Sequence, residues 1–371
     1  MSRNWTNEQR DAINAREGSV LVSAAAGSGK TAVLVERVIE RLTDKNNPTD
    51  ADRLLIVTFT RAAAGEMRER IADAIAERLR ENPTDENLIN QQMLLPSAKI
   101  CTIDSFCSGI VKEYFQYLDI APDFKTADEG ELSVLRQKAV DETLEKMYVN
   151  GGENFRNLVE LLFSGRDDRS LGNTIMRLHE NSMSFPFPDK WLDSLAKCYE
   201  IRTSASESIF GNVICNYVTT AVTYALEVFS SILNDCQGDE DMQKIFLKAV
   251  TSDKTQCEYI LSRLEEGSWD EARNAIMRFD AVRRGNTPKH LKDDFTVQRN
   301  VAARKKMTEN IKALSNVMCC SEKEYTEDME YFYPMIKSLT EATKLFTQIY
   351  GEIKKTKKIA DFRDIAQMAL S

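Results

Sequence analysis

The first hundred residues alternate short apolar runs with longer stretches whose apolar side chains recur at helical spacing. Residues 19–23 (SVLVS) form such a run and residues 31–42 follow with a helical pattern, which predicts a strand, a turn and a helix. Residues 54–58 and 99–103 are apolar runs of the same kind, and each also leads into a helical pattern. Three strand-then-helix units in succession predict parallel strands joined by helical crossovers.

The pattern changes near residue 126. Asp128, with Glu131 three residues later, is typical of a helix N-terminus, and apolar residues then recur at helical spacing. From there to about residue 345 the sequence contains helical patterns and no convincing strand. We therefore expect an α/β region followed by a large all-helical region. Residues 209–233 are predicted to be a buried helix and not a membrane span, because polar side chains interrupt this longest apolar stretch.

The chain as a whole is acidic, so any contact with nucleic acid must be confined to local basic regions. Lys and Arg number 49 against 58 Asp and Glu, so the formal net charge is −9. Residues 278–306 are an exception, with nine Lys or Arg against three Asp. This basic stretch could follow a DNA backbone through phosphate contacts, or it could form a solvated helical face. The run at residues 354–358 (KKTKK) is shorter, and a solvated face is favoured for it.

Histidine and cysteine usage argues against two classes of chemistry. Only His179 and His290 could serve as imidazole bases or ligands, so histidine-centred hydrolysis and histidine-rich zinc sites are unexpected. The eight cysteines contain no C-x-x-C pair, which favours buried thiols in a reducing cytosol over disulfides or zinc. The N-terminus has no apolar core before a cleavage site, so we expect a cytoplasmic protein without a signal peptide or a membrane partner.

Residues 24–31 (AAAGSGKT) match a phosphate-binding loop between the first predicted strand and its helix. Gly27 and Gly29 allow backbone N–H groups to curl around a β-phosphate, and the helix N-terminus adds positive potential. Lys30 would reach the β- and γ-phosphates, and the Thr31 hydroxyl could ligate Mg²⁺. The usual first glycine is replaced by Ala24. The expected site for ATP and Mg²⁺ comprises Ala24, Ala25, Ala26, Gly27, Ser28, Gly29, Lys30 and Thr31.

Three further segments accompany this loop, namely residues 5–9 (WTNEQ), 58–67 (TFTRAAAGEM) and 102–107 (TIDSFC). In this order and spacing, the four segments resemble the amino-terminal motifs of superfamily 1 helicases of the UvrD/RecB kind. Residues 117–148, residues 158–192 and the sequence IADFRD at 359–364 narrow the resemblance to the AddA family of helicase–nuclease subunits. The resemblance covers most of the chain, with a looser match over residues 235–345.

The resemblance implies roles for individual residues. Gln9 would hydrogen-bond adenine through both ends of its side-chain amide, with an exposed glutamine at a helix start as the alternative. Phe59 and Thr60 would stack on single-stranded DNA and bind its backbone, with core packing as the alternative for Phe59. Ser105 would contact a phosphate, whereas Phe106 could contact DNA or fill the core.

The chain departs from the family pattern at two positions. Arg61 stands where the second motif usually has asparagine, and it could still meet a phosphate with a different geometry. Asp104 stands where the third motif commonly has histidine; a carboxylate repels phosphate, so we expect Asp104 to cap a helix instead. Because the family's inserted subdomain contacts duplex DNA, the basic stretch adds three candidate DNA-binding residues, Arg283, Arg284 and Lys289.

The sequence lacks the motif with which such an ATPase hydrolyses ATP. An Asp-Glu pair after an apolar strand would order Mg²⁺ and the attacking water, but the pairs at 85–86, 128–129, 141–142 and 270–271 lie in polar or helical contexts. The segment resembling residues 361–364 precedes that motif in the family. We therefore expect a fragment that is inactive by itself, with the second motor domain and a nuclease domain beyond it.

The fold implied by the resemblance is a RecA-like parallel sheet with helices on both faces, incomplete at its C-terminal end, plus a large all-α inserted subdomain. Motor domain 1A would begin in residues 1–125 and resume in 346–371, with subdomain 1B in 126–345. The implied protein is an ATP-dependent helicase subunit that acts on single-stranded DNA and duplex ends in double-strand-break repair, as a heterodimer with an AddB-like partner. Another UvrD-like repair helicase and a non-catalytic DNA- or partner-binding module are the alternatives.

Overall fold

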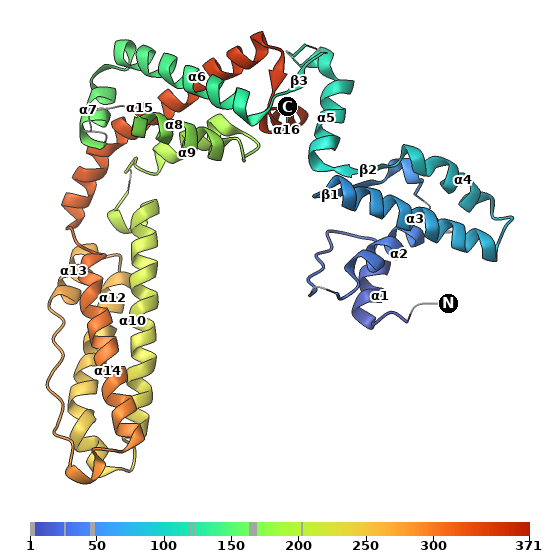
Figure 1. Ribbon diagram of the computed structural model, residues 1–371. Helices are drawn as coiled ribbons and strands as arrows, with labels where there is room; N and C mark the ends of the chain where they lie inside the picture. Colours follow the sequence, from blue (N-terminus) through green and yellow to red (C-terminus); the bar gives the residue numbers. More distant parts are fainter. Residues whose placement is uncertain are drawn as a thin grey trace. The chain divides into compact units, whose positions relative to one another are not determined.

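The computed structural model describes residues 4–25, 27–44, 49–118, 120, 121, 123–162, 169–201 and 203–371. The chain divides into two compact units. Unit 1 consists of Met1–Leu135 and Gly351–Ser371, and unit 2 consists of Arg136–Tyr350. Most of the described residues lie in helices (Figure 1).

Besides three 3₁₀ turns, unit 1 contains six α-helices and four short strands in the described residues, namely α1 (Asn7–Asn14), α2 (Lys30–Leu42), β1 (Leu55–Thr58), α3 (Arg61–Glu81), α4 (Glu86–Leu94), β2 (Lys99–Thr102), α5 (Ile103–Glu113), β3 (Lys125–Thr126), β4 (Ile359–Ala360) and α16 (Phe362–Leu370). Two long helices continue from one unit into the other, α6 (Glu129–Asn150) and α15 (Glu322–Thr356). The other helices belong to unit 2, namely α7 (Gly152–Leu162), α8 (Arg169–Ser182), α9 (Pro188–Lys197), α10 (Ile209–Asp235), α11 (Glu240–Met242), the π-helix η5 (Gln243–Leu247), α12 (Lys248–Glu265), α13 (Trp269–Met277) and α14 (Phe295–Ala313).

Unit 1 contains a parallel strand pair joined by helices, as the alternating pattern predicts. β1 and β2 pair from Leu55 opposite Lys99 to Thr58 opposite Thr102, and α3 and α4 lie between them in the chain. One face of this pair packs on α2, α3 and α4. The shared core contains Val38, Ile39, Leu42, Ile56, Met67, Ile71, Ile75, Leu88, Leu95 and Ile100.

The apolar run at residues 19–23 does not form the strand that its pattern predicts. Val20, Leu21 and Val22 are 44%, 95% and 48% exposed, and none of the four strands of the described chain pairs with them. A strand requires a neighbour that accepts and donates its backbone hydrogen bonds. In the described residues β1 bonds only to β2, so this run has no ladder to join.

The β1–β2 pair is covered on one face only, which also differs from the prediction of helices on both faces. Leu55 and Val57 alternate with the buried Ile56 and are 47% and 45% exposed. Alternation along a strand sends neighbouring side chains to opposite faces. The face that carries Leu55 and Val57 is therefore open in the described chain.

The chain leaves unit 1 and returns to it at one place, where two short strands pair. β3 and β4 are parallel, with Lys125 opposite Ile359. α6 begins shortly after β3, and Asp128 accepts a hydrogen bond from the backbone N–H of Glu131 at 2.9 Å. This contact confirms the helix start predicted there. α15 ends shortly before β4, so the start and the end of the intervening chain lie side by side.

Lys354 is buried at this junction, so the prediction of a solvated face for residues 354–358 is wrong at this position, whereas the four residues after it are exposed. Its Nζ donates to Asp361 Oδ2 at 3.0 Å and to a carboxylate oxygen of Asp364 at 2.6 Å. Asp361 and Asp364 also cap α16 reciprocally, each accepting the other's backbone N–H. Burial raises the pKa of Asp364, whereas for Asp361 the effect of burial is outweighed by the charge of Lys354 and hydrogen bonds, which lower its pKa.

Two further lysines of the run also pair with acidic residues at the junction. Lys357 Nζ lies 3.5 Å from Glu131 Oε1, and Lys358 Nζ lies 2.9 Å from Asp123 Oδ2. The sequence pattern identified a cluster of positive charge, but the partners lie more than two hundred positions away along the chain. Only folding brings these charges together.

Unit 2 consists of packed helices, and α10 lies along α12 and α14 (Figure 1). α10 has the length and composition of a membrane span, the only such helix within the described residues. Val218, Val222, Ala225 and Phe229 are buried in the core of unit 2, whereas Val213, Tyr217 and Tyr224 of the same helix are exposed. The prediction of a buried helix therefore holds for one face of α10 only. Residues 279–288 contain no helix, which differs from the helical pattern predicted for this region.

All eight cysteines are free thiols, and they differ in exposure. Cys236 and Cys257 are buried, whereas Cys319 is exposed. Burial raises the pKa of Cys257 to about 12, which keeps its thiol protonated at neutral pH.

Replacing Lys354 with alanine should destabilise unit 1 strongly. The substitution leaves Asp361 and Asp364 buried without their cation, and breaking a buried ion pair from one side costs about 3–5 kcal/mol. Lys357→Ala is the matched control, because its partly exposed pair with Glu131 is worth at most about 1 kcal/mol. Urea unfolding measures both; equal losses for the two variants would contradict the role given to Lys354.

Candidate functional site

The predicted phosphate loop has the backbone geometry that an anion site needs. Gly27 and Gly29 have φ angles of 79° and 83°, in the left-handed region that glycine adopts without strain. α2 begins directly after Gly29, and no side-chain hydrogen bond caps it in the described chain. Its first N–H groups are therefore available to an anion. Ala26, which belongs to the predicted set, lies outside the described residues.

Lys30 folds back onto its own loop. Its Nζ donates to the carbonyl oxygen of Ala24 at 2.5 Å and lies 3.4 Å from that of Ala25. Both Lys30 and Thr31 are exposed, so a phosphate and its magnesium ion have access to them. The cation is thus held beside the loop by neutral carbonyls, which a phosphate oxygen would outcompete because charged acceptors bind an ammonium more strongly.

Gln9 lies against this loop although nineteen positions separate it from Ser28. Its Nε2 donates to the Ser28 carbonyl at 3.2 Å, and its Oε1 accepts the backbone N–H of Thr6 at 3.0 Å. The second bond belongs to the capping box of α1. Both ends of the amide are therefore engaged with protein, and reading an adenine requires these two bonds to be exchanged for bonds to the base.

The loops after β1 and β2 lie at one edge of the strand pair. Thr58 and Thr102 are opposite each other in the parallel register, so the residues that follow them leave the sheet on the same side. Both strands lead into a helix whose first turn is capped by a threonine. Thr60 caps α3 two residues after β1, and Thr102, the last residue of β2, caps α5, which follows directly. The sequence motifs at 58–67 and 102–107 are thereby brought together.

Phe59 projects from this edge with 97% of its surface exposed, which excludes core packing. Thr60 accepts the backbone N–H of Ala63 at 3.1 Å, so its hydroxyl already serves as the cap of α3. Arg61 is the first residue of α3 and is exposed. An aromatic face, a helix N-terminus and a guanidinium therefore lie within three consecutive residues.

The start of α5, after β2, exposes fewer groups to a ligand. Ser105 is exposed, its backbone N–H bonds Thr102 Oγ1 at 3.2 Å, and its Oγ accepts the same hydroxyl at 2.9 Å. The cap of α5 is thus Thr102, and the prediction that Asp104 caps this helix is wrong; Asp104 lies in the first turn. Phe106 is half-buried, with Lys99 Nζ 5.8 Å from its ring centre.

The basic stretch at 278–306 belongs to unit 2, and the structure separates its cations into two groups. Arg283 and Lys289 are exposed. Arg284 is turned inward, with Nη1 donating to the Gly285 carbonyl at 2.9 Å and to Thr287 Oγ1 at 2.8 Å. Of the three residues predicted to meet DNA, Arg284 is therefore already committed to protein acceptors.

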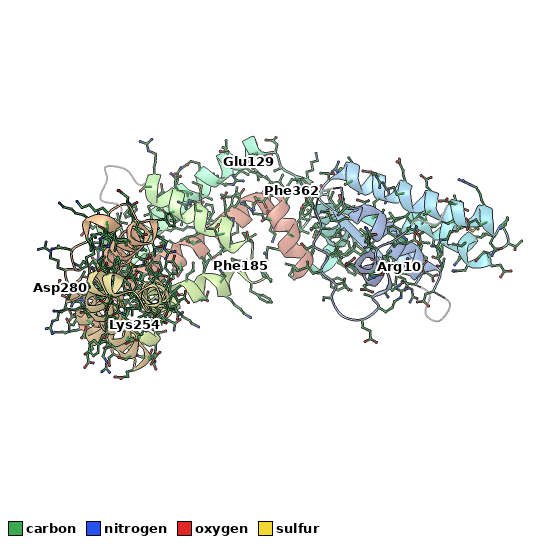
Figure 2. All side chains as sticks on the ribbon, turned by 90° about the horizontal axis from the view of Figure 1, so that it is seen from below. Arg10, Glu129, Phe185, Lys254, Asp280 and Phe362 are labelled. Atoms are coloured by element: carbon green, nitrogen blue, oxygen red, sulfur yellow. The ribbon has the colours of Figure 1, made fainter. Side chains whose placement is uncertain are left out.

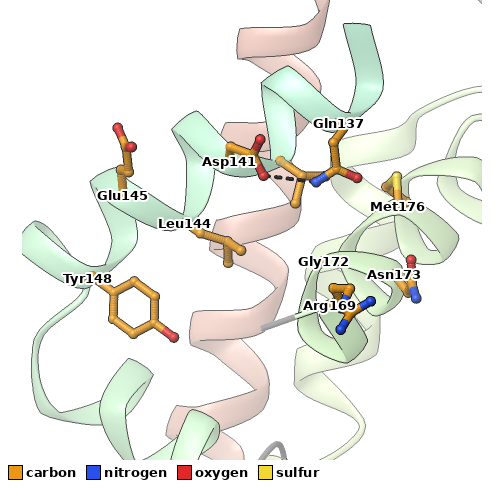
Figure 3. Close-up of a pocket in the computed structure, with 10 residues that line it drawn as sticks. Gln137, Asp141, Leu144, Glu145, Tyr148, Arg169, Gly172, Asn173 and Met176 are labelled. Carbon is orange, nitrogen blue, oxygen red and sulfur yellow. Dashed lines mark hydrogen bonds between the residues drawn. The ribbon is translucent and has the colours of Figure 1, made fainter. Parts of the chain in front are cut away.

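A cavity of about 390 Å³ opens between α6 and α8 of unit 2 (Figure 3). None of the predicted nucleotide or DNA residues lines it. Its lining consists of Gln137, Val140, Asp141, Leu144, Glu145, Tyr148, Arg169, Gly172, Asn173 and Met176. Asp141 accepts a hydrogen bond from Gln137 at 2.8 Å, so these two polar groups satisfy each other.

The four Asp-Glu pairs occupy helical positions. Asp85 caps α4 and Asp128 caps the first turn of α6, while the pairs at 141–142 and 270–271 lie inside α6 and α13. A carboxylate that caps a helix already accepts backbone N–H groups. The pairs at 85–86, 141–142 and 270–271 do not follow a strand, and the pair at 128–129, which comes just after the short strand β3, is committed to the start of α6 through the Asp128 cap.

The comparisons with known proteins agree with these features. Residues 5–371 match the UvrD/REP helicase N-terminal domain, and the chain belongs to this helicase family. More specifically, it is similar over 99% of its length to the A subunit of the ATP-dependent helicase/nuclease of Acetivibrio thermocellus, with 37% identity. The proteins of the same name from Clostridioides difficile and Thermoanaerobacter sp. strain X514 are 35% and 36% identical over the whole chain. The resemblance predicted from the motifs is thus confirmed. The chain spans about 30% of the length of these relatives.

Some contacts that fix the basic stretch could not be found from the sequence. Gln256, Asp253 and Arg304 hold the irregular segment at 279–288 in unit 2, and they carry no motif. Gly285 was a signal in the sequence, because a glycine inside a pattern predicted to be helical weakens the prediction of a helix there.

Replacing Gly29 with alanine should strain the loop. A left-handed conformation costs a residue with a Cβ about 1–2 kcal/mol, although the added atom itself would meet only Gln9 Nε2 at 3.8 Å. Gly65→Ala is the matched control with the opposite sign, since Gly65 lies inside α3 with open space around it and should gain about 0.5–1 kcal/mol. Chemical denaturation compares the two; a stabilising Gly29→Ala would contradict the loop geometry.

Proposed function

We propose that this chain is the amino-terminal part of an ATP-dependent DNA helicase and translocase subunit that works with a nuclease on DNA ends in double-strand-break repair and recombination. The observation that carries the proposal is a phosphate loop with two left-handed glycines before an uncapped helix, in a chain that matches the UvrD/REP helicase N-terminal domain. Exposure of the loop and of Lys30 supports the binding of a large anion there.

The residues of the loop fit ATP with Mg²⁺. Bound ATP supplies the phosphoryl group whose hydrolysis drives movement along DNA. The N–H groups of the loop and of the start of α2 would donate to the phosphates, and Lys30 would exchange its bonds to Ala24 and Ala25 for phosphate oxygens. Thr31 would ligate the metal. Gln9 would release Thr6 and Ser28 to read the adenine edge.

The edge formed after β1 and β2 would form part of the track for single-stranded DNA. Phe59 would stack on a base, because its face is free and base stacking tolerates any sequence. Thr60, Arg61 and Ser105 would bind the backbone beside it. In unit 2, Arg283 and Lys289 of the basic stretch would contact the phosphates of a duplex, with Arg284 contributing less directly because it bonds protein acceptors.

We further propose the organisation that this function implies. Residues 1–125 and 346–371 would form the first part of a RecA-like motor domain, and residues 126–345 an inserted helical subdomain. The relatives are named as one component of a helicase/nuclease, which supports a nuclease domain in the remainder of their length and a second, AddB-like partner. The protein would act in the cytoplasm, where the DNA of a bacterium lies.

A second candidate is a module that binds nucleotide or DNA without hydrolysis. The helical positions of all four Asp-Glu pairs favour it for the 371-residue chain taken alone. An ATPase assay on this chain, with and without single-stranded DNA, separates the two candidates. DNA-stimulated turnover by a pure preparation would show that the chain contains its own catalytic carboxylate.

In the protein as its gene encodes it, Lys30→Ala should lower DNA-stimulated ATP hydrolysis by at least about a hundredfold. The substitution removes the cation that stabilises negative charge on the transferred phosphoryl group. Lys197→Ala, which removes an exposed lysine from α9, is the control and should keep the wild-type rate. Near-normal turnover by the Lys30 variant would refute the assignment of the loop.

Phe59→Ala should weaken binding of single-stranded DNA without affecting stability. Loss of one stacked base costs about 1–3 kcal/mol of binding, while truncation of a side chain that is 97% exposed changes unfolding by less than about 0.5 kcal/mol. Phe362→Ala removes a different exposed aromatic ring from unit 1 and serves as the control. Fluorescence anisotropy with an oligonucleotide gives the affinities; equal values for the two variants would exclude stacking on Phe59.

A further inference from the structure

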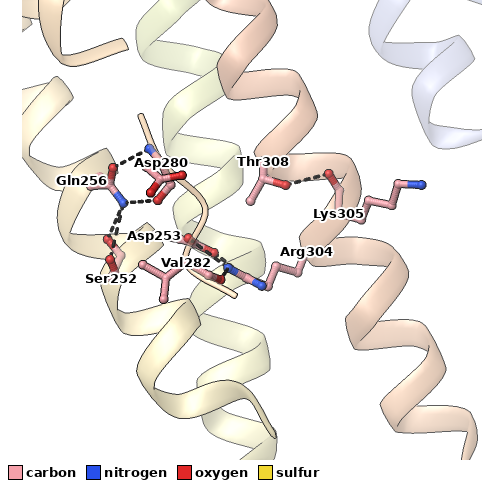
Figure 4. Close-up of polar contacts among 8 residues, drawn as sticks. All are labelled: Ser252, Asp253, Gln256, Asp280, Val282, Arg304, Lys305 and Thr308. Carbon is pink, nitrogen blue, oxygen red and sulfur yellow. Dashed lines mark hydrogen bonds and ion pairs between the residues drawn. The ribbon is translucent and has the colours of Figure 1, made fainter. Parts of the chain in front are cut away.

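The segment between α13 and α14, residues 278–294, runs along unit 2 and is called the strap here; it is irregular except for a 3₁₀ turn at Lys289–Leu291. Its first anchor is Gln256 of α12, whose Nε2 donates to the Asp280 carbonyl at 2.9 Å while its Oε1 accepts the Asp280 backbone N–H at 2.9 Å (Figure 4). Figure 2 marks Asp280 and, on α12, Lys254. One side-chain amide thus satisfies both backbone groups of a residue, much as a neighbouring strand would.

The second anchor is a buried ion pair. Arg304 of α14 donates to both carboxylate oxygens of Asp253, at 2.6 and 3.2 Å, and Asp253 is completely buried. The same Arg304 Nη2 donates to the Val282 carbonyl at 2.7 Å (Figure 4). Burial raises the pKa of Asp253, and Arg304 opposes that rise. Arg304 of this buried pair therefore also donates a hydrogen bond to the backbone of the strap.

The third anchor is the π-helix η5. The Gly285 N–H donates to the Ile245 carbonyl at 2.9 Å, and a Cβ at Gly285 would lie 2.1 Å from the Lys244 carbonyl oxygen. The strap backbone can come this close only with glycine. The wider π turn interrupts the regular i to i+4 ladder of the helix at the place where the Ile245 carbonyl accepts this bond.

Between and beyond these anchors the strap exposes cations. Arg283 lies between the anchored Val282 and Gly285, and Lys289 and Lys292 follow. All three are exposed, and none has an ion-pair partner within the part of the chain that the structure describes. The strap carries five cations against three carboxylates, and one of these, Asp294, is used as the cap of α14.

We propose that Gln256 and the Asp253–Arg304 pair are positioning residues that fix the strap, so that Arg283, Lys289 and Lys292 meet the phosphates of a DNA duplex as a preorganised row. The inference rests on the proposed function, because it assumes that the basic stretch contacts DNA. Fixing the backbone beforehand removes the ordering cost that a loose loop would incur on binding. The anchors touch no DNA themselves and act through the strap.

The test measures how steeply log affinity falls with log salt for a blunt-ended duplex, with the protein as its gene encodes it. The slope is given below as its magnitude. Two variants loosen the strap without changing the net charge or any exposed cation. One is the double variant Asp253→Leu with Arg304→Met, and the other is Gln256→Leu. Each should lower the slope by about 0.9 for every phosphate contact that is lost. Gln237→Leu removes a glutamine bond elsewhere in unit 2 and should leave the slope unchanged. The triple variant Arg283→Ala, Lys289→Ala and Lys292→Ala reports direct contact.

The outcomes separate the inference from the function on which it rests. A lower slope for the triple variant and for both anchor variants supports positioning. A lower slope for the triple variant with wild-type slopes for the anchor variants overturns positioning and leaves the DNA contact intact. An unchanged slope for the triple variant would show that the strap does not contact DNA, which would also overturn the inference. Circular dichroism checks folding; if the double variant is unfolded, Gln256→Leu decides.

Discussion

The parallel pairing of β3 with β4 is the constraint on which the arrangement of the chain depends. It requires the long segment between residues 126 and 359 to begin and end at one point. Lys354 stabilises this junction from inside, because a buried ammonium needs carboxylate partners and here finds Asp361 and Asp364. The same two carboxylates start α16, which packs on α5. The junction is therefore connected to the helix that carries Ser105.

The predicted phosphate loop and the apolar run before it depend on interactions of different range. The left-handed glycines and the bond of Lys30 to Ala24 act within the loop, and Gln9 adds one bond from α1. The preceding run at 19–23 stays unpaired, because a strand depends on a neighbour elsewhere in the chain. The backbone geometry of the predicted phosphate loop thus forms without a paired strand before it in the described residues.

A buried ion pair organises part of unit 2 beside its apolar core. Asp253 is fully buried and would be costly without Arg304, which satisfies it and also binds the strap. A buried pair of this kind adds little net stability over apolar packing, but it tolerates few alternative partners. Its contribution is therefore best understood as fixing one path for residues 278–294 among the many open to an irregular segment.

The sequence by itself determined the local features. Glycine spacing, helix caps such as Asp128, and apolar runs such as 54–58 and 99–103 act through residues close together in the chain, and the motifs they form were enough to identify the helicase family. The tertiary structure alone decided which runs find partners and which charges are buried. The unpaired run at 19–23, the buried Lys354 and the inward Arg284 differ from their sequence patterns for one physical reason. The free energy of a backbone ladder or of a charge depends on neighbours that only folding supplies.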